Sequence, residues 1–200
     1  MKEHLYVWFD TEYSSLDLES AVLLQAAALI TDTSLMRVLP PEHDVRMVIQ
    51  LPKGIRLSSW VRQNLRGLLR QCRSSEAMSI GDADDRLRGY VDMAAVTPVE
   101  KEGLRPVLAG NSVHADWLLA RRFLPHFVER LHYRQLDVTA FKLEWLRRNA
   151  HPEFKKENPD MVREYFPQAL LSVSDGRHDA YYDVQASVAE LAFYRRHLFR

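Results

Sequence analysis

Short apolar runs separated by polar turns follow one another along the chain and predict alternating strands and helices. Runs rich in β-branched or aromatic residues predict strands over residues 4–9, 22–31, 45–50, 104–109 and 135–138. The first of these runs, HLYVWF, ends at Asp10, and the third lies between prolines. The alanines within 22–31 leave a buried helix open as the alternative for that segment.

Other stretches carry apolar residues at helical spacing, and several begin with a residue that commonly caps a helix N-terminus. Helices are expected from Ser58 or Ser59 to about Arg73, after Asp82, from Asn111 or Ser112 to Arg122, over 139–149, and from about Asp179 to His197. The three prolines within 151–177 predict that this stretch is mostly loop with one short helix.

The predicted order is three strands, two helices, strand, helix, strand, helix and a last helix. This order indicates an α/β fold with a mixed central sheet flanked by helices. A length of 200 residues suits a single domain, 1–200, with a substantial buried core. No internal repeat or Gly/Ser linker divides the chain.

Composition and charge narrow the class of protein. An apolar content of 46% is typical of a soluble globular protein, and no run of about 18 apolar residues predicts a membrane span. The N-terminus reaches acidic residues too soon for a signal peptide, so a cytoplasmic location is expected. With 27 basic and 27 acidic residues, the chain is not expected to coat long nucleic acid, and a short substrate is favoured.

Cys72 is the single cysteine, which excludes an intramolecular disulfide and argues against a cysteine-based zinc cluster. The thiol could act as a nucleophile or a redox sensor. An inert thiol on a helix is the favoured interpretation, because no nucleophile motif surrounds Cys72.

Acidic residues in three places suggest metal chemistry. Asp10 and Glu12 lie two residues apart at the end of a predicted strand, so both carboxylates can face one site. Two carboxylates at such a short distance repel each other unless a cation neutralises them, and such oxygen ligands suit Mg²⁺ or Mn²⁺. Asp116 falls in the first turn of a predicted helix, and Asp183 lies one turn into the last predicted helix. Taken singly, each acid could also be solvated or favour a helix N-terminus.

His178 precedes the last predicted helix, and Ala180 would let that helix lie close to the sheet. An imidazole near a carboxylate-bound metal is suited to take a proton from water, although a lone histidine is more often a surface or capping residue. Asp137 is interpreted as structural and Asp179 as an acid at a helix N-terminus. The run Asp82, Asp84 and Asp85 is interpreted as the solvated start of a helix.

The motifs D-x-E, a mid-chain helical Asp and H-x-A-x-x-D occur here in an order that resembles the DEDDh exonucleases of the ribonuclease H-like superfamily. Within that group, several passages look like the oligoribonuclease family. They are LAGNSVHADWLLARRFLP (108–125), LHYRQLDVTAFK (131–142) and HDAYYDVQASVAELAFYRRHLF (178–199), with FDTEYSSLDLE (9–19) and AALITD (27–32) in the same register. The stretches 66–104 and 150–177 match poorly.

The resemblance implies a ribonuclease H-like exonuclease fold and a 3′→5′ exoribonuclease that degrades dinucleotides to nucleoside 5′-monophosphates. It also implies that two divalent cations, Mg²⁺ or Mn²⁺, are held by Asp10, Glu12, Asp116 and Asp183, with His178 as the general base. A diverged exonuclease acting on single-stranded DNA or longer RNA is the alternative. A binding module without catalysis is a further alternative, which the complete set of five residues disfavours.

The resemblance further implies substrate-binding roles and a homodimer. Leu16 and Trp60 match a pair that wedges and stacks the two bases, although a tryptophan is more often a core residue. Residues matching a cap for the 5′ phosphate, partly supplied by the partner subunit, are Ser112, Arg134 and Thr139. Tyr133 matches a tyrosine that reaches into the neighbouring active site.

The chain departs from the family pattern at several positions near these motifs. Ala115 stands where glutamine is common and Gln185 where arginine is common. Thr11 replaces the usual methionine of the first motif, and Tyr181 and Tyr182 replace a smaller residue and an acid. These changes spare the expected metal ligands and bear on the preference for dinucleotides.

Overall fold

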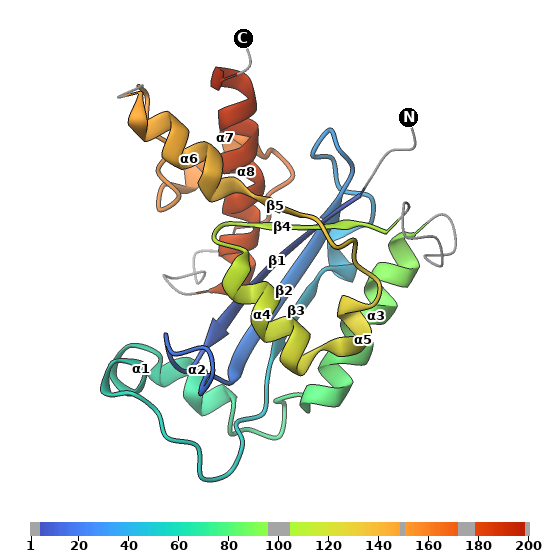
Figure 1. Ribbon diagram of the computed structural model, residues 1–200, viewed down its shortest axis with the longest axis vertical. Helices are drawn as coiled ribbons and strands as arrows, with labels where there is room; N and C mark the ends of the chain where they lie inside the picture. The colour runs from blue at the N-terminus through green and yellow to red at the C-terminus, as the bar shows by residue number, and fades with distance from the viewer. Residues whose placement is uncertain (1–4, 96–104, 149–150, 172–178, 199–200) are drawn as a thin grey trace.

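The computed structural model describes residues 5–95, 105–148, 151–171 and 179–198 (Figure 1). Within these residues a five-stranded sheet has the strand order β3-β2-β1-β4-β5. Its strands are β1 (Tyr6–Tyr13), β2 (Leu23–Thr31), β3 (Val45–Val48), β4 (Val107–Gly110) and β5 (Gln135–Asp137). The first three strands pair antiparallel, whereas β4 and β5 run parallel to β1, so the sheet is mixed as predicted.

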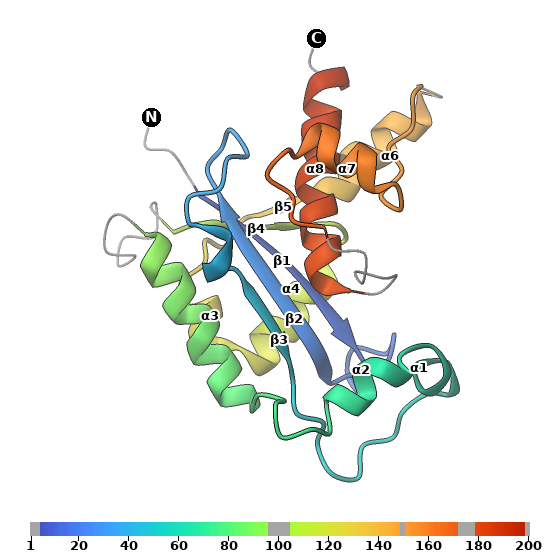
Figure 2. The ribbon, with the colours of Figure 1, turned by 180° about the vertical axis from the view of Figure 1, so that it is seen from behind.

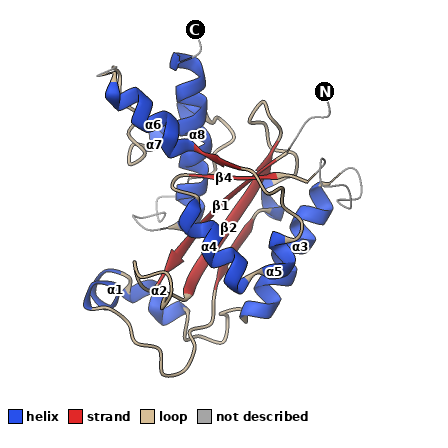
Figure 3. Cartoon of the chain, viewed as in Figure 1, coloured by secondary structure: helices blue, strands red, loops and turns tan. Residues whose placement is uncertain are grey.

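Helices cover both faces of this sheet (Figures 2 and 3). They are the 3₁₀ helix η1 (Pro41–His43) and the α-helices α1 (Ser59–Asn64), α2 (Arg66–Gln71), α3 (Ile80–Ala94), α4 (His114–Phe123), α5 (Pro125–Val128), α6 (Val138–Arg147), α7 (Pro159–Tyr165) and α8 (Ala180–Leu198). No helix among the described residues is long and apolar enough to span a membrane.

The side chains of β1 alternate between two core clusters, one on each face of the sheet. Val7 and Phe9 are buried with residues of α3, α4 and α5 on one face of the sheet. Trp8 is buried on the other face with residues of α6, α7 and α8. Because side chains alternate along a strand, Asp10 and Glu12 belong to the face of Trp8, under α8.

β1 continues beyond Asp10, where the predicted strand 4–9 stops. Asp10, Thr11 and Glu12 lie opposite Ala27, Ala26 and Gln25 of β2. Backbone pairing with a long central neighbour outweighs the low strand propensity of acidic residues. The two carboxylates are therefore fixed on a paired strand and not on a loop that follows it.

Two helix predictions need correction. The helix expected from Ser58 or Ser59 to Arg73 is interrupted at Leu65, although the Ser58 hydroxyl does cap α1 by accepting from the Val61 N–H at 3.1 Å. α4 has Val113 at its N-cap position without a side-chain cap, so the prediction of Asn111 or Ser112 as its cap is wrong. The Asn111 amide instead donates to the Ser187 hydroxyl at 3.0 Å.

The interpretation of Asp84 as solvated is also wrong. α3 begins before Asp82, and Asp84 is buried on its inner face. Its carboxylate accepts hydrogen bonds from the backbone N–H groups of His126 and Phe127, at 3.0 and 2.8 Å. Asp84 thus accepts hydrogen bonds from backbone N–H groups at the N-terminus of α5 that have no partner within the helix. The hydrophobic pattern did not predict this short helix.

Cys72 lies buried at the C-terminal end of α2, and its thiol donates to the Leu24 carbonyl at 3.3 Å. Burial raises the pKa of Cys72 to about 11. The thiol therefore stays protonated at neutral pH, which agrees with the inert interpretation.

Candidate active site

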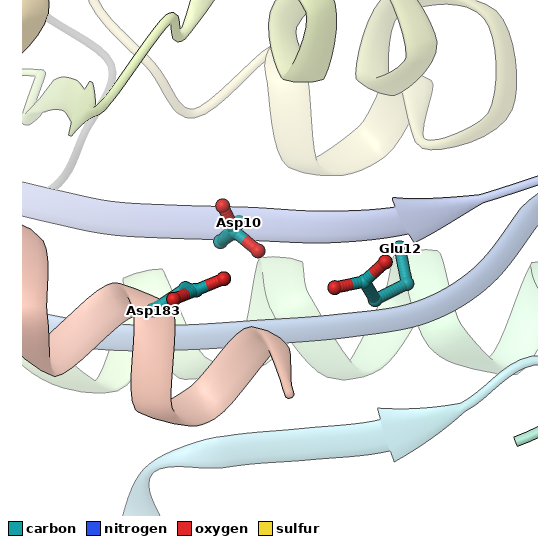
Figure 4. A group of neighbouring side chains, drawn as sticks. All are labelled: Asp10, Glu12 and Asp183. Atoms are coloured by element: carbon teal, nitrogen blue, oxygen red, sulfur yellow. The ribbon is translucent and has the colours of Figure 1, made fainter. Parts of the chain in front are cut away.

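Among the described residues, the carboxylates of Asp10, Glu12 and Asp183 form a group whose ligand oxygens lie within 4.8 Å of one another. Figure 4 shows Asp10 and Glu12 on β1 and Asp183 on the first turn of α8, with their oxygens directed toward a common space. Three oxygen ligands at this spacing suit a hard divalent cation such as Mg²⁺ or Mn²⁺.

The N-terminus of α8 is fixed over β1 and β2 by polar contacts. The Asp179 carboxylate accepts from the N–H groups of Tyr181 and Tyr182, both at 3.0 Å, so its predicted role at the helix N-terminus is confirmed. Gln25 of β2 donates to Asp179 at 3.3 Å and accepts from the Ala180 N–H at 3.1 Å. Because Gln25 lies opposite Glu12, these bonds hold Asp183 over the two acids of β1.

Crowding of negative charge defines the electrostatics of the site. Burial, and then the charges of Asp116, Asp183 and Glu12, raise the pKa of Asp10 well above its ordinary value. Burial and the charge of Asp183 raise the pKa of Glu12 to about 7. These carboxyl groups repel one another when ionised, so a multivalent cation among them would be strongly favoured.

Asp116 is held differently from the other three acids. It lies buried on α4, and burial raises its pKa to about 7 against the opposing effect of a hydrogen bond from Thr11. The Thr11 hydroxyl donates to Asp116 Oδ1 at 2.6 Å. Thr11 faces the opposite side of β1 from Asp10, so Asp116 approaches the site from the α4 side of the sheet. The structure therefore groups three of the four predicted ligands and places the fourth within electrostatic reach.

Lys156 belongs to the site and was not predicted from the sequence. Its ammonium nitrogen lies 3.0 Å from Asp183 Oδ1. Lys156 lies in the stretch that matches the family poorly, and a lysine in a polar loop has no pattern that would single it out. His178, the predicted general base, falls within 172–178 and lies outside the described residues.

The two residues expected to contact bases are exposed. Leu16 is 91% exposed and Trp60 is 50% exposed, so Trp60 is not a core residue. The β1–β2 connection, which carries Leu16, lies beside α1, which carries Trp60 (Figures 1 and 2). Apolar side chains at such exposure are available to a ligand.

The predicted phosphate-cap residues are partly brought together. The hydroxyls of Ser112 and Thr139 lie 3.2 Å apart, and Asp137 joins their backbones by accepting from the N–H of each at 3.0 and 2.9 Å. This confirms the structural interpretation of Asp137. Tyr133 is 63% exposed, and Arg134 is also exposed with its guanidinium 5.4 Å from the Tyr133 ring.

The departures at 181 and 185 form part of a buried polar network. Arg37 donates to the Tyr181 hydroxyl at 3.3 Å and to the Gln185 side-chain oxygen at 3.4 Å. Asp44 forms an ion pair with Arg37 and accepts from Tyr181 at 2.6 Å. The network ties the first two turns of α8, and hence Asp183 between them, to the segment that follows β2.

Comparison with known proteins finds relatives that match nearly the whole length of this chain. The mitochondrial oligoribonuclease of Bos taurus is 31% identical over 198 residues, covering 97% of this chain and 73% of its own. The oligoribonuclease of Corynebacterium glutamicum is 31% identical over 201 residues, covering 96% and 79%. No protein-family model matches the chain.

Solved structures resemble the fold at low identity. Exonuclease I of Methylocaldum szegediense superposes with a TM-score of 0.68 at 17% identity, over 98% of this chain and 41% of its own length. S. pombe Pop2p, in a form bound to Mg²⁺ and Mn²⁺, gives a TM-score of 0.62 at 11% identity, over 97% and 84%. This chain thus spans less than half of the exonuclease I chain.

The mixed sheet, together with the proteins that this chain resembles, defines a 3′→5′ exonuclease with the ribonuclease H-like fold, as predicted. An acidic group able to bind metal lies on that sheet. The chain belongs to the oligoribonuclease family, and the predicted 3′→5′ exoribonuclease activity is confirmed at the level of the family.

Proposed function

We propose that this chain hydrolyses short single-stranded RNA from its 3′ end, prefers dinucleotides, and releases nucleoside 5′-monophosphates. The observation that carries the proposal is the carboxylate group of Asp10, Glu12 and Asp183 on a sheet of this family. The relatives named oligoribonuclease support the short substrate. Zero net charge supports it too, since binding to long nucleic acid is driven largely by basic charge.

Asp10, Glu12, Asp116 and Asp183 are the residues that would hold two divalent cations, Mg²⁺ or Mn²⁺. This donor set fits such cations. The pKa values of Asp10 and Glu12 are raised because the four carboxyl groups are buried and crowded, and a positive charge among them would stabilise their ionised forms. When bound, such cations lower the pKa of water and stabilise charge on a leaving oxygen. The protein's part is to hold the carboxylates in place on β1, α4 and α8, and the hydrogen bond from the Thr11 hydroxyl also favours the ionised form of Asp116.

His178 is proposed as the general base that accepts the proton of the attacking water at an imidazole nitrogen. His178→Ala is expected to lower kcat by about 10²–10⁴-fold while KM for an RNA dinucleotide changes little. Steady-state kinetics at saturating Mn²⁺ measures the split. His151→Ala, which removes an exposed histidine, is the control and should keep the wild-type kcat. A raised KM with an unchanged kcat would contradict the role of His178.

Leu16 and Trp60 are proposed to hold the two bases of a dinucleotide. Their exposure supports this role, because a base can reach an exposed side chain. Stacking on an aromatic face contributes about 1–3 kcal/mol per base, whatever the base. Ser112, Thr139 and Arg134 are proposed to bind the 5′ phosphate, where the arginine can donate two parallel hydrogen bonds. A bound 5′ end would exclude longer RNA and explain the preferred length.

A homodimer is proposed in which the partner supplies Tyr133 and Arg134 to complete each site. Both side chains are exposed and line a surface hollow next to β5. A two-fold axis presents the same surface twice, so both sites would be completed together. The homodimer and the cytoplasmic location stay predictions.

Mixing two defective chains tests the composite site. Asp10→Ala and the double variant Tyr133→Ala, Arg134→Ala are each expected to be weakly active or inactive alone. Co-refolded, they should recover activity in heterodimers that contain one intact composite site. Light scattering that shows a fully active monomer would refute the arrangement, and so would proven heterodimers without activity.

A further inference from the structure

A lysine outside the family's motifs lies beside the carboxylates of the proposed metal site. Lys156 Nζ is 3.0 Å from Asp183 Oδ1, and the lysine side chain retains 44% of its exposure. It follows α6 in a stretch that leads into α7, far in sequence from β1 and α8. Its ammonium therefore reaches Asp183 from a third segment of the chain, the one between α6 and α7.

The backbone around Lys156 is anchored, so the ammonium is not carried by a free loop. The Tyr182 hydroxyl donates to the Lys156 carbonyl at 2.6 Å. Phe154, two residues earlier, is buried in the cluster formed with α8. Asn158, two residues later, caps α7 by accepting from the Asp160 N–H at 3.0 Å. These contacts hold the base of the lysine side chain beside Asp183.

The charge of Lys156 acts on the whole acidic group. It is paired with Asp183, and a carboxylate oxygen of Asp183 lies within 4.8 Å of one of Asp10 and one of Glu12. A lysine ammonium is positive at neutral pH, so it partly neutralises the acids that would hold a cation.

We propose that Lys156 is a tethered cation that occupies Asp183 Oδ1 in the metal-free enzyme and must move away when a divalent cation binds there. The ammonium and a metal ion at one carboxylate oxygen repel each other, because both are positive. Lys156 thereby sets how much divalent metal the enzyme needs before it is competent. The inference rests on the proposed metal site.

Calorimetric titration of the metal-free protein with Mn²⁺, without RNA, tests the proposal. Lys156→Gln removes one positive charge from the site and is expected to tighten Mn²⁺ binding by roughly tenfold. Lys156→Arg keeps the charge and should stay within about threefold of the wild type. Lys155→Gln makes the same change of net charge at a neighbouring exposed lysine and should stay within about twofold, because exposed charges are screened.

Tyr182→Phe provides a second route to the same result. It removes the hydroxyl that holds the Lys156 carbonyl while leaving the lysine in place. Mn²⁺ binding should tighten by about threefold, since the ammonium is then held less firmly at Asp183. Circular dichroism of each variant shows whether it is folded.

The outcomes separate this proposal from the proposed metal site. A wild-type protein that binds no Mn²⁺ would overturn both. A wild-type protein that binds Mn²⁺, with Lys156→Gln no tighter than Lys155→Gln, would overturn the role of Lys156 alone. If Lys156→Gln does not fold, unchanged binding in Tyr182→Phe would overturn that role in its place.

Discussion

Asp10→Asn is expected to lower kcat by at least about a thousandfold and to raise the free energy of unfolding of the metal-free protein. The loss of activity follows from removing a proposed ligand of cations that contribute several kcal/mol, at about 1.4 kcal/mol for each factor of ten. The gain in stability follows because Asp10 is buried among Asp116, Asp183 and Glu12, whose charges raise its pKa. An amide of the same shape removes that repulsion.

The pH dependence of stability tests the same crowding. Burial raises the folded-state pKa of Glu12 and of Asp116 to about 7, above the values near 4 of an unfolded chain. Such groups bind more protons when folded, so their contribution is complete below about pH 4 and is lost as pH rises through about 7. The melting temperature of the metal-free protein should therefore fall between pH 5 and 8.

Thermal melts in EDTA and in Mn²⁺ measure this effect. Mn²⁺ should raise the melting temperature more at pH 8 than at pH 5, since the ligands must be ionised. Asp10→Asn should flatten the slope in EDTA, whereas Glu42→Gln, at an exposed acid, should leave it unchanged. Retained activity in Asp10→Asn would refute the site assignment, and a slope unaffected by this variant would refute the crowding.

Asp44→Ala is expected to lower the free energy of unfolding by about 3–5 kcal/mol, because it leaves the Arg37 guanidinium buried without its carboxylate. The side chains of Arg37 and Asp44 retain only 4% and 1% of their exposure. The same carboxylate also accepts from the hydroxyls of Tyr90 and Tyr181, at 3.0 and 2.6 Å. Urea denaturation of the metal-free protein measures the loss.

A surface ion pair supplies the control. Arg130 and Asp92 lie 2.9 Å apart with side chains that are 33% and 40% exposed. Asp92→Ala should cost less than about 1 kcal/mol, as exposed pairs do. The double variant Arg37→Met, Asp44→Leu should be more stable than Asp44→Ala, since it leaves no buried charge. Equal losses in Asp44→Ala and Asp92→Ala would show that burial of the pair does not matter.

The parts of the site set by local pattern could be predicted from the sequence. Alternation along β1 places Asp10 and Glu12 on one face whatever the exact end of the strand. The capping role of Asp179 follows from its place before an apolar helical stretch, and that helix carries Asp183. These features depend on a few neighbouring residues, which explains why they could be predicted.

Features that depend on distant contacts could not be predicted. Asp84 lies in an acidic run that looks solvated, yet it is buried because α5 needs an acceptor for its first N–H groups. The arginine beside Gln185 and Tyr181 comes from position 37, more than a hundred residues away. Lys156 reaches Asp183 only through the path of the loop before α7. In each case the partner is set by tertiary packing, which no local pattern reports.

Turnover of a length series of 5′-labelled RNAs, from dinucleotide to heptamer with a DNA dinucleotide alongside, measures whether the protein prefers RNA dinucleotides. The RNA dinucleotide is expected to give the highest kcat/KM and to release nucleoside 5′-monophosphate. EDTA should stop the reaction, and Mn²⁺ should restore it. Trp60→Ala should reduce kcat/KM for the dinucleotide by roughly tenfold or more, as loss of one stacked base implies. Equal rates on the heptamer or on DNA, or turnover that persists in EDTA, would contradict the proposed function.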